Sequence, residues 1–529
     1  MGSRKLQIWL PLLFAMVMIA GMIIGFQLKE KTMASRFLTV SSRSSIQELT
    51  ELIKNKYVDK VSEDSINALV ATQLLEHLDP HSVFIPAKEL SAVNEEMMGN
   101  FQGIGIEFRM IDDTVNVMSV MKNGPAEKAG LLPGDRLLAV SDTIAVSGKK
   151  MDADRIRSLF RGELNSQVKV KYLRNKKIQS VTITRNIIPV NSIDAAYLVE
   201  PGKGYIRINK FAERTYEEFM QNLEKLQAQK MQSLIVDLRG NGGGLMKEAV
   251  DIADEFLDDN KLIVYTEGEH APRMEYRCKR PGLFEKGKLV VLIDETSASA
   301  SEVLAGALQD WDRATIIGRR SFGKGLVQQQ FQLSDGAAVR LTVARYFTPL
   351  GRNIQKSYNK GVKAYQDELI NRFHQNDSSA KKEPGDSTRK IFKTQSGKIV
   401  YGGGGITPDT AIAFDSTRFS NQFIQLLMTG SLNNFAYRYF VQNNALFGQF
   451  KSPESFSAGY VPGNAEWVAL TAYAQKDQID LSPVNAKGKE IILNRFKALI
   501  ARHLWRDQGY FMISNQHDPV IGKALQILK

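Results

Sequence analysis

The chain has 529 residues, of which 43% are hydrophobic and 24% charged, and its formal net charge at pH 7 is +12. This composition is that of an ordinary globular protein, and the length is sufficient for several domains. The basic side chains are scattered along the sequence and accompany no recognisable nucleic-acid-binding motif, so we expect no nucleic-acid partner. The single cysteine, Cys278, excludes an intrachain disulfide, and no zinc-type spacing is present.

An apolar segment near the start of the chain, IWLPLLFAMVMIAGMIIGF, covers residues 8–26 without a charged side chain. A helix of this length extends about 28 Å, enough to cross the core of a bilayer. Signal peptides usually have a shorter apolar region, and the sequence TMA ending at Ala34 is a poor cleavage site. The sequence therefore predicts an uncleaved anchor within residues 8–28, in preference to a cleaved signal, with most of the chain outside the cytoplasm.

Residues 41–94 carry apolar side chains at helical spacing, interrupted by LDPHSVFIP at 78–86. His77 and His81 lie four residues apart, as two metal ligands on a helix would. Pro80 separates them, however, and no further ligand completes a set. The sequence favours a turn or helix-capping role for this stretch over a metal site.

Three further sequence patterns follow along the chain. Residues 101–188 alternate apolar and polar side chains in short runs, which is typical of half-buried strands. Residues 191–414 alternate strand-like and helical runs, which predicts an α/β domain with crossover helices. Within that region, the polar stretch 376–390 is predicted to be a solvated loop. After residue 416 aromatic-rich helical segments predict a separate helical domain.

Three serines alternate with alanines in DETSASASEV, at positions 297, 299 and 301. The preceding run, 288–294, is predicted as a buried strand and the following run, 301–311, as a helix. Backbone N–H groups at such a junction are unpaired and can stabilise developing negative charge. Serines at a junction are also ordinary helix caps, and Ser301 is best placed for that role.

A serine hydroxyl needs a base to become a nucleophile. None of the six histidines lies in a recognisable serine-hydrolase motif, and no G-x-S-x-G sequence occurs. A neutral lysine can replace histidine, and the segment SFGKGLVQQQ supplies Lys324 between two glycines, with Gln328 four residues later. The amide oxygen of Gln328 could orient the lysine amine, although a lysine between glycines is more often an exposed loop residue.

A glycine loop between a strand and a helix occurs in IVDLRGNGGGLMKEA, residues 235–249. Such loops often bind phosphate groups, but neither glycine-rich nucleotide motif is complete here. The same geometry would serve as an oxyanion hole.

The segments DLRGNGGGL, TSASASEVLAGALQD, FGKGLVQQ and GGGGITPD occur in the order in which they are found in C-terminal processing peptidases, also called tail-specific proteases, and resemble the motifs of that family. The resemblance implies a Ser–Lys serine peptidase with a crotonase/ClpP-like α/β core and no metal or cofactor. It assigns Ser299 as the nucleophile, Lys324 as the general base and Gln328 as the residue that orients it. The backbone N–H groups of Gly244 and Ala300 are the implied oxyanion donors.

The β-rich region resembles a PDZ domain through FQGIGIEF (101–108) and GPAEKAGLLPGDRLLAV (124–140). Successive backbone N–H groups of Gly103, Ile104, Gly105 and Ile106 are expected to receive the carboxylate of a peptide added as a strand. Ile104 and Ile106 would line a pocket for an apolar last residue. The implied partners are therefore proteins or peptides with free, apolar C-termini.

The predicted architecture is multidomain α/β, with an N-terminal helical region, a PDZ domain inserted before the peptidase core, and a C-terminal α-helical domain. The boundaries are 1–28 for the cytoplasmic N-terminus and anchor, 29–98 for the helical region, 99–188 for the PDZ domain, 189–415 for the core and 416–529 for the last domain.

We predict a serine endopeptidase that recognises free C-termini and cleaves unstructured tails. The predicted location is the cell inner membrane, with the catalytic part periplasmic or otherwise extracytoplasmic. The sequence leaves open whether the protein forms a homo-oligomer or binds an adaptor protein. Two alternatives are a PDZ-based scaffold with an inactive Ser–Lys pair and a crotonase-like acyl-CoA enzyme. The intact motifs disfavour the first, and the PDZ module together with Ser299 and Lys324 disfavours the second.

Overall fold

The computed structural model describes residues 11, 14–24, 45–148, 151–375, 390–415 and 420–529. They belong to two units, Met1–Leu74 and Leu75–Lys529, and each unit is described by itself. The first unit contains a helical segment at 14–24, α2 (Ser45–Lys56) and most of α3 (Glu63–Glu76). The second unit begins with the end of α3 and with α4 (Ala87–Met98), so helices are present across the region where the sequence predicts them.

Among the described residues, no helix is both long and apolar enough to cross a membrane. Of the predicted anchor at 8–28, the structure describes only residues 11 and 14–24, and the remainder lies outside the described residues. The predicted solvated loop at 376–390 also lies outside them, apart from Lys390.

The predicted β-rich module forms a sheet in the order β3-β4-β5-β7-β8, with β6 paired to β5. In β7, Val168, Val170 and Tyr172 are buried between exposed neighbours, which is the alternation predicted from the sequence. Strand β3 lies at an edge of the sheet. The elements are β3 (Ile106–Ile111), β4 (Thr114–Val120), α5 (Pro125–Lys128), β5 (Arg136–Val140), β6 (Ile144–Ala145), α6 (Ala153–Phe160), β7 (Gln167–Arg174) and β8 (Lys177–Thr184). Beside them, β2 (Asn100–Gly103) pairs with β9 (Asn186–Pro189) and joins the two ends of the module.

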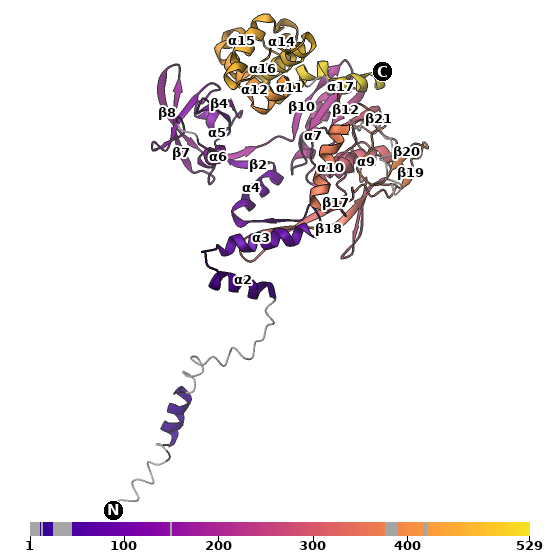
Figure 1. The fold of residues 1–529 in the computed structure, drawn as a ribbon. Coiled ribbons are helices and arrows are strands. Elements are labelled where there is room, and N and C mark those ends of the chain that lie inside the picture. Colours follow the sequence, from indigo (N-terminus) through magenta and orange to yellow (C-terminus); the bar gives the residue numbers. More distant parts are fainter. Residues whose placement is uncertain (1–10, 12–13, 25–44, 149–150, 376–389, 416–419) are drawn as a thin grey trace, which may run out of the picture. The chain divides into compact units, whose positions relative to one another are not determined.

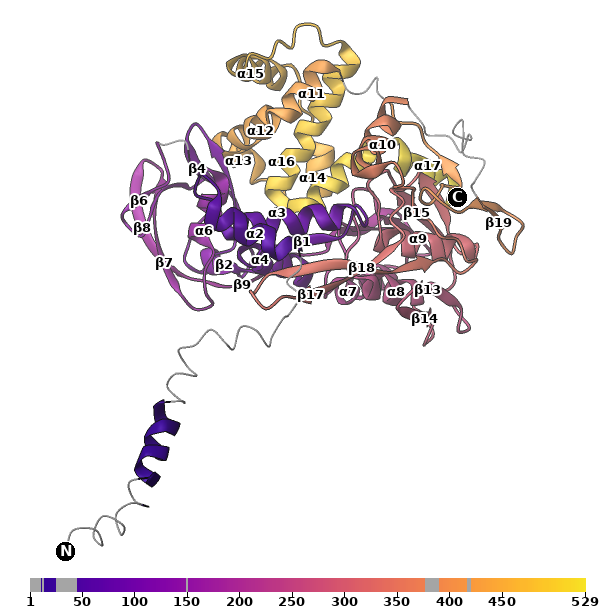
Figure 2. The ribbon, with the colours of Figure 1, turned by 60° about the horizontal axis from the view of Figure 1, so that its bottom comes forward.

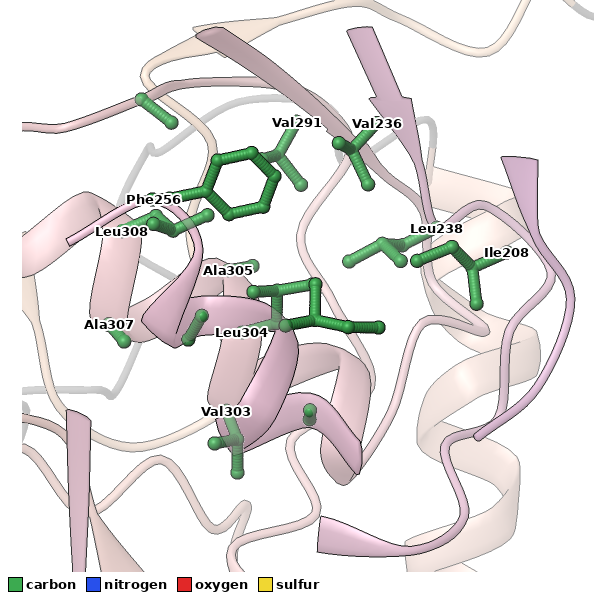
Figure 3. Close-up of a cluster of buried hydrophobic side chains, with 14 of the residues drawn as sticks. Ile208, Val236, Leu238, Phe256, Val291, Val303, Leu304, Ala305, Ala307 and Leu308 are labelled. Atoms are coloured by element: carbon green, nitrogen blue, oxygen red, sulfur yellow. The ribbon is translucent and has the colours of Figure 1, made fainter. Parts of the chain in front are cut away.

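The predicted peptidase core contains a six-stranded sheet in the order β10-β11-β12-β15-β16-β21, parallel except at β10. Both faces are covered, which explains the continuous apolar runs. Val236 belongs to the cluster beneath α7, α8 and α9 (Figure 3), whereas its neighbour Ile235 faces the opposite side. The elements are β10 (Ile193–Glu200), β11 (Lys203–Ile208), α7 (Thr215–Ala228), β12 (Ser233–Asp237), α8 (Met246–Asp254), β15 (Lys288–Ile293), α9 (Ala300–Asp310), β16 (Thr315–Gly318) and β21 (Thr410–Ala411).

A second sheet has the order β1-β18-β13-β14, with β17 also paired to β18. It brings the LDPHS segment, which precedes β1, to the same sheet as the lysine loop, which precedes β17. Its strands are β1 (Val83–Ile85), β13 (Leu262–Gly268), β14 (Ala271–Arg277), β17 (Leu326–Gln332) and β18 (Ala338–Phe347). Between β18 and β21 the chain forms α10 (Gly361–Gln375) and a hairpin of β19 (Ile391–Lys393) and β20 (Ile399–Tyr401).

The segment after residue 420 is helical, as the sequence predicts. We call residues 420–514 the helical tail domain. Its core is aromatic: the ring of Phe435 lies 5.3 Å from that of Phe496 and 5.7 Å from that of Tyr473. In both ribbon views α12 runs beside α16 (Figures 1 and 2). The helices are α11 (Asn421–Met428), α12 (Ser431–Gln442), α13 (Asn444–Phe447), α14 (Pro453–Gly459), α15 (Asn464–Ala474) and α16 (Ala486–Ser514).

The end of the chain returns to the peptidase sheet. Helix α16 is kinked at Trp505 and Arg506, where the backbone leaves helical geometry. Beyond the kink, the side-chain amide of Gln508 bonds both the N–H (2.9 Å) and the carbonyl (3.1 Å) of Ala196 on β10. The last helix, α17 (Pro519–Ile527), buries Val520, Ile521 and Ala524 against the face of the sheet opposite α9.

Candidate active site

Ser299 occupies the sharp turn between β15 and α9. Its backbone has φ +56° and ψ −115°, a conformation that L-residues rarely adopt and that costs about 1–3 kcal/mol. The side chain is half-buried, and its hydroxyl donates no hydrogen bond to another described residue. Strain of this kind is commonly stored where a side chain must be presented for chemistry.

The two flanking serines have structural partners. Ser297 Oγ donates to the carbonyl of Leu238 (2.9 Å) and accepts the N–H of Asp294 (2.9 Å). Ser301 Oγ donates to the carbonyl of Asn241 (2.9 Å). The capping role favoured for Ser301 is therefore wrong, because Ser301 lies inside α9 and its hydroxyl ties the helix to the glycine loop. Ser299 itself is the residue at the helix cap.

The glycine loop packs directly against this turn. Its Asn241 carbonyl accepts the N–H of Ala298 (3.0 Å), and its Asn241 side chain accepts the N–H of Gly243 (2.8 Å). The carbonyl of Gly243 accepts the N–H of Phe211, and the N–H of Leu245 donates to the carbonyl of Phe211. The N–H of Gly244, which lies between these two bonds, therefore faces away from Phe211. Within the described residues, the N–H groups of Gly244 and Ala300 have no acceptor. Two donors beside a serine hydroxyl are what an oxyanion hole requires.

We expect Gly243→Ala to damage this arrangement. A Cβ at Gly243 would lie 2.6 Å from the carbonyl oxygen of Ala298 and 2.8 Å from the Cβ of Ser299, and φ is +99°. Peptidase kcat should fall by about 10²-fold or more, since the displaced loop can no longer aim its donors. Gly242→Ala is the matched control, because no heavy atom lies within 4 Å of its added Cβ. Equal losses in the two variants, measured on one peptide substrate, would contradict this account of the loop.

Lys324 lies on the loop that opens β17, and its side chain is half-buried. Its Nζ donates to the amide oxygen of Gln328 (2.9 Å), and the Gln328 amide nitrogen in turn donates to the carbonyl of His81. Burial lowers the pKa of Lys324 below its ordinary value, and the positive charge of Arg340 lowers it further. Both effects favour the neutral amine that a general base requires. The described residues include no hydrogen bond between Ser299 Oγ and Lys324 Nζ.

Glu302 joins the serine turn to the lysine loop, and the sequence analysis assigned it no role. Its side chain is fully buried. One carboxylate oxygen accepts the N–H groups of both Ser299 (2.9 Å) and Lys324 (2.9 Å), and the other accepts the N–H of Gly323 (2.7 Å) and the hydroxyl of Ser321. Burial raises the pKa of Glu302 to about 7 against the opposing effect of these four donors. The i+3 spacing from Ser299 was the available signal, since an acid three residues after a cap residue commonly bonds the cap N–H.

The GGGGITPD segment supports the lysine loop from the other side. A Cβ at Gly323 would lie 3.0 Å from the backbone of both Gly404 and Gly405, and φ at Gly323 is +91°. The N–H of Ile406 bonds Ser321 Oγ (2.6 Å), and the N–H of Gly325 bonds the side chain of Gln355 (2.8 Å). The lysine loop is therefore fixed along its length.

The LDPHS segment forms the turn that the sequence predicts. Asp79 accepts the N–H groups of His81 (2.8 Å) and Ser82 (2.8 Å). The ring of His81 bonds the hydroxyl of Tyr365 (2.7 Å), and burial together with the charge of Lys324 lowers the pKa of His81 to about 4. Among the described residues, no group of three or more His, Cys, Asp or Glu side chains is placed to hold a metal ion.

The PDZ carboxylate loop lies between β2 and β3. Gly103 pairs within the β2–β9 ladder and bridges to Arg161, whereas the N–H groups of Ile104 and Gly105 have no acceptor in the described part of the chain. Ile104 is buried in the core of the module, and Ile106 begins the edge strand β3. Both contribute to a cavity of about 640 Å³ along β3 and α6.

The chain matches the models of three protein families. Residues 202–364 match the model of peptidase family S41, residues 102–184 match a PDZ domain, and residues 422–507 match a family of unknown function, DUF8443. The chain is similar to a carboxy-terminal-processing protease of Bartonella bacilliformis, with 34% identity over 58% of this chain and 71% of that protein. It is equally similar, at 34% identity over 58% of this chain and 72% of the relative, to a carboxyl-terminal-processing protease of Synechocystis.

Among solved structures, the photosystem II D1 C-terminal processing protease is 32% identical, covering 59% of this chain and 89% of that one with a TM-score of 0.33. The sequence comparisons define the class of this protein as an S41 serine peptidase with a PDZ domain. Within that class, the chain belongs to the carboxy-terminal-processing proteases.

Proposed function

We propose that the protein recognises the free C-terminus of a protein substrate through its PDZ domain and cleaves an unstructured C-terminal tail by a Ser–Lys acyl-enzyme mechanism. The observation that carries the proposal is the junction at Glu302, where one carboxylate oxygen accepts the N–H groups of both Ser299 and Lys324. Two loops from distant parts of the chain are thereby held together around a strained serine and a lysine with a lowered pKa.

In the proposed first step, neutral Lys324 Nζ takes the proton of Ser299 Oγ as Oγ bonds to the scissile carbonyl carbon. The N–H groups of Ala300 and Gly244 stabilise the resulting oxyanion. The C–N bond then breaks, and the departing amine receives the proton from Lys324. Hydrogen bonds of this type are often absent before substrate binds, so Ser299 and Lys324 need only meet in the complex.

In the second step, a water molecule gives a proton to Lys324 and attacks the acyl-ester carbonyl. The ester C–Oγ bond breaks, Ser299 Oγ regains its proton from Lys324, and the new C-terminal acid is released. Gln328 acts as a positioning residue, since its amide oxygen accepts a hydrogen bond from the Lys324 amine in the free protein.

We propose further that a peptide joins the edge strand β3 and places its carboxylate at the N–H groups of Ile104 and Gly105. The edge position of β3 and the absence of acceptors for these two groups within the described residues support this step.

We also propose attachment to the cell inner membrane through residues 8–28, with the catalytic part outside the cytoplasm. The length and apolarity of residues 8–26 support this proposal. Fractionation of cells tests it: the full chain should stay with washed membranes, whereas a chain lacking residues 1–28 should be released. Release of both chains would overturn the proposal.

The test of the catalytic proposal compares the full chain with Ser299→Ala on an unstructured protein that ends in apolar residues. Mass spectrometry should find tail fragments with the parent chain only, and amidation of the substrate C-terminus should reduce cleavage about ten-fold by removing the carboxylate. Tight binding of the free tail without any cleavage by the parent chain would favour a PDZ-based binding protein instead.

A further inference from the structure

The groove beside β3 has two walls from different domains. Its cavity of about 640 Å³ is lined on one side by the PDZ domain, including Ile106, Phe108 and Phe160, and on the other by the turn between α11 and α12. That turn, which we call the tail turn, consists of Leu427, Met428, Thr429 and Gly430. The helical tail domain, which matches a family of unknown function, thus contributes to the PDZ groove.

The tail turn is attached to the edge strand itself. Arg109 on β3 donates to the side chain of Asn434 (3.1 Å) and to the carbonyl of Gly430 (3.4 Å). The approach at Gly430 is close, since a Cβ there would lie 3.0 Å from the Arg109 guanidinium. Glu107, two residues earlier on β3, pairs with Arg502 of α16 (2.8 Å). The residues before and after Phe108, Glu107 and Arg109, therefore both contact the helical tail domain and hold the second wall of the groove in place.

One charged side chain of the groove, that of Arg109, differs from the others in its partners. Arg161 pairs with Glu95 and Arg157 with Asp154. Arg109 has no carboxylate partner among the described residues, because the groups it bonds, Gly430 and Asn434, are neutral. No neighbouring carboxylate in the described part of the chain therefore balances the positive charge of its guanidinium, and an incoming acidic side chain can pair with it. Such charge-assisted bonds are stronger than neutral ones.

The direction of a bound peptide decides which of its residues meets Arg109. A peptide that adds to β3 with its carboxylate at Ile104–Gly105 runs antiparallel to β3, so its upstream residues pass Phe108 and Arg109 and reach the tail turn. At about 3.4 Å per residue, Arg109 stands beside the position about two to four residues before the last one. Met428, whose side chain is 85% exposed, projects from the opposite wall.

We propose that the tail turn is the second wall of the peptide groove and that Arg109, held by it, selects C-terminal tails carrying an acidic side chain a few residues before an apolar last residue. This inference rests on the proposed function, because it assumes that the PDZ domain receives a free C-terminus. It gives the helical tail domain a role in choosing substrates.

The test measures binding of fluorescent eight-residue peptides to the full chain carrying Ser299→Ala, so that no cleavage occurs. Two peptides end in a free leucine carboxylate and differ only by Asp or Asn at the third and fourth positions from the end. The Asp peptide should bind about five-fold or more tightly. Arg109→Gln should abolish that preference, whereas Arg136→Gln, on β5 and outside the groove, should preserve it.

A second pair of variants tests the wall contributed by the tail. Met428→Asp should weaken the Asp peptide about five-fold more than the Asn peptide by like-charge repulsion. Val461→Asp, at another exposed apolar position of the tail domain (78% exposed), should affect neither. Equal affinities of the parent for both peptides, or an inert Met428→Asp, would overturn the inference. Amidated peptides that bind as tightly as free acids would instead overturn the proposed recognition of the C-terminus, so the two failures are distinguishable.

Discussion

Lys324→Met is expected to lower kcat by roughly 10²–10⁴-fold with little change in KM, because the general base is removed while the peptide groove is untouched. The substitution keeps an apolar stem of similar length, and the backbone N–H of residue 324 can still bond Glu302. Steady-state kinetics on a tail-derived peptide checks the expectation. Lys497→Met provides a matched control, since Lys497 is another buried lysine whose pKa is lowered by burial, but it bonds Ser457 in the helical tail domain.

The pH profile separates a base from a merely structural lysine. Only the neutral amine can accept the Ser299 proton, so activity should rise with pH until Lys324 is fully deprotonated. Because burial lowers the pKa of Lys324, that rise should be complete at a lower pH than an ordinary lysine would allow. A profile flat between about pH 5 and 9 would contradict the assignment of Lys324 as the base. Lys324→Arg, which retains a positive charge but cannot deprotonate, should be as inactive as Lys324→Met.

The sequence predicted those parts of the molecule that local pattern determines. Alternation predicted the strands of the PDZ module, and the succession of strand-like and helical runs predicted an α/β domain with crossover helices. The spacing of Lys324 and Gln328 on one short segment predicted their hydrogen bond, because four residues across a loop and strand opening leave the two side chains within reach.

Other features depend on contacts between distant segments and could not be predicted in this way. Ser301 resembles a helix cap in local sequence, but its hydroxyl bonds Asn241, sixty residues earlier in the chain. The aromatic-rich helices after residue 416 look uniform in sequence, yet α17 covers the peptidase sheet and the tail turn lines the PDZ groove. Helical periodicity identifies an apolar face but not the surface that will cover it.

Glu302→Gln is expected to lower kcat by about 10–100-fold, although the side chain touches neither substrate nor reacting atoms. An ionised carboxylate accepts all four donors around it, whereas an amide turns its NH₂ group toward two of them and leaves at least one buried backbone N–H unpaired. The loops of Ser299 and Lys324 then lose their common attachment. Glu248→Gln is the control: Glu248 is also a buried acid that accepts a backbone N–H, from Tyr216, and its pKa is also raised by burial.

The pH dependence of this variant distinguishes a positioning role from simple destabilisation. In the parent, activity at acid pH requires both a neutral Lys324 and an ionised Glu302, so log kcat/KM should rise more steeply below about pH 7, where Glu302 titrates, than titration of the lysine alone would allow. In Glu302→Gln only the lysine titrates, and the slope should fall to about one. An unchanged slope would show that Glu302 does not control the active geometry through its charge.

The contribution of Glu302 to stability should change with pH in the opposite direction from activity. Glu302 has a pKa of about 7 in the folded protein, above its ordinary value of 4.5, so the folded state holds a proton that the unfolded chain releases between these two values. The contribution of Glu302 to the free energy of unfolding therefore falls as pH rises through this window, by up to about 3 kcal/mol, and then stays constant. Denaturant unfolding of Glu302→Gln should lack this fall, while Glu248→Gln should retain it. Ionisation of Glu302 thus supports activity over the range in which its burial costs stability, which is the behaviour expected when a buried charge is kept to hold two catalytic loops together.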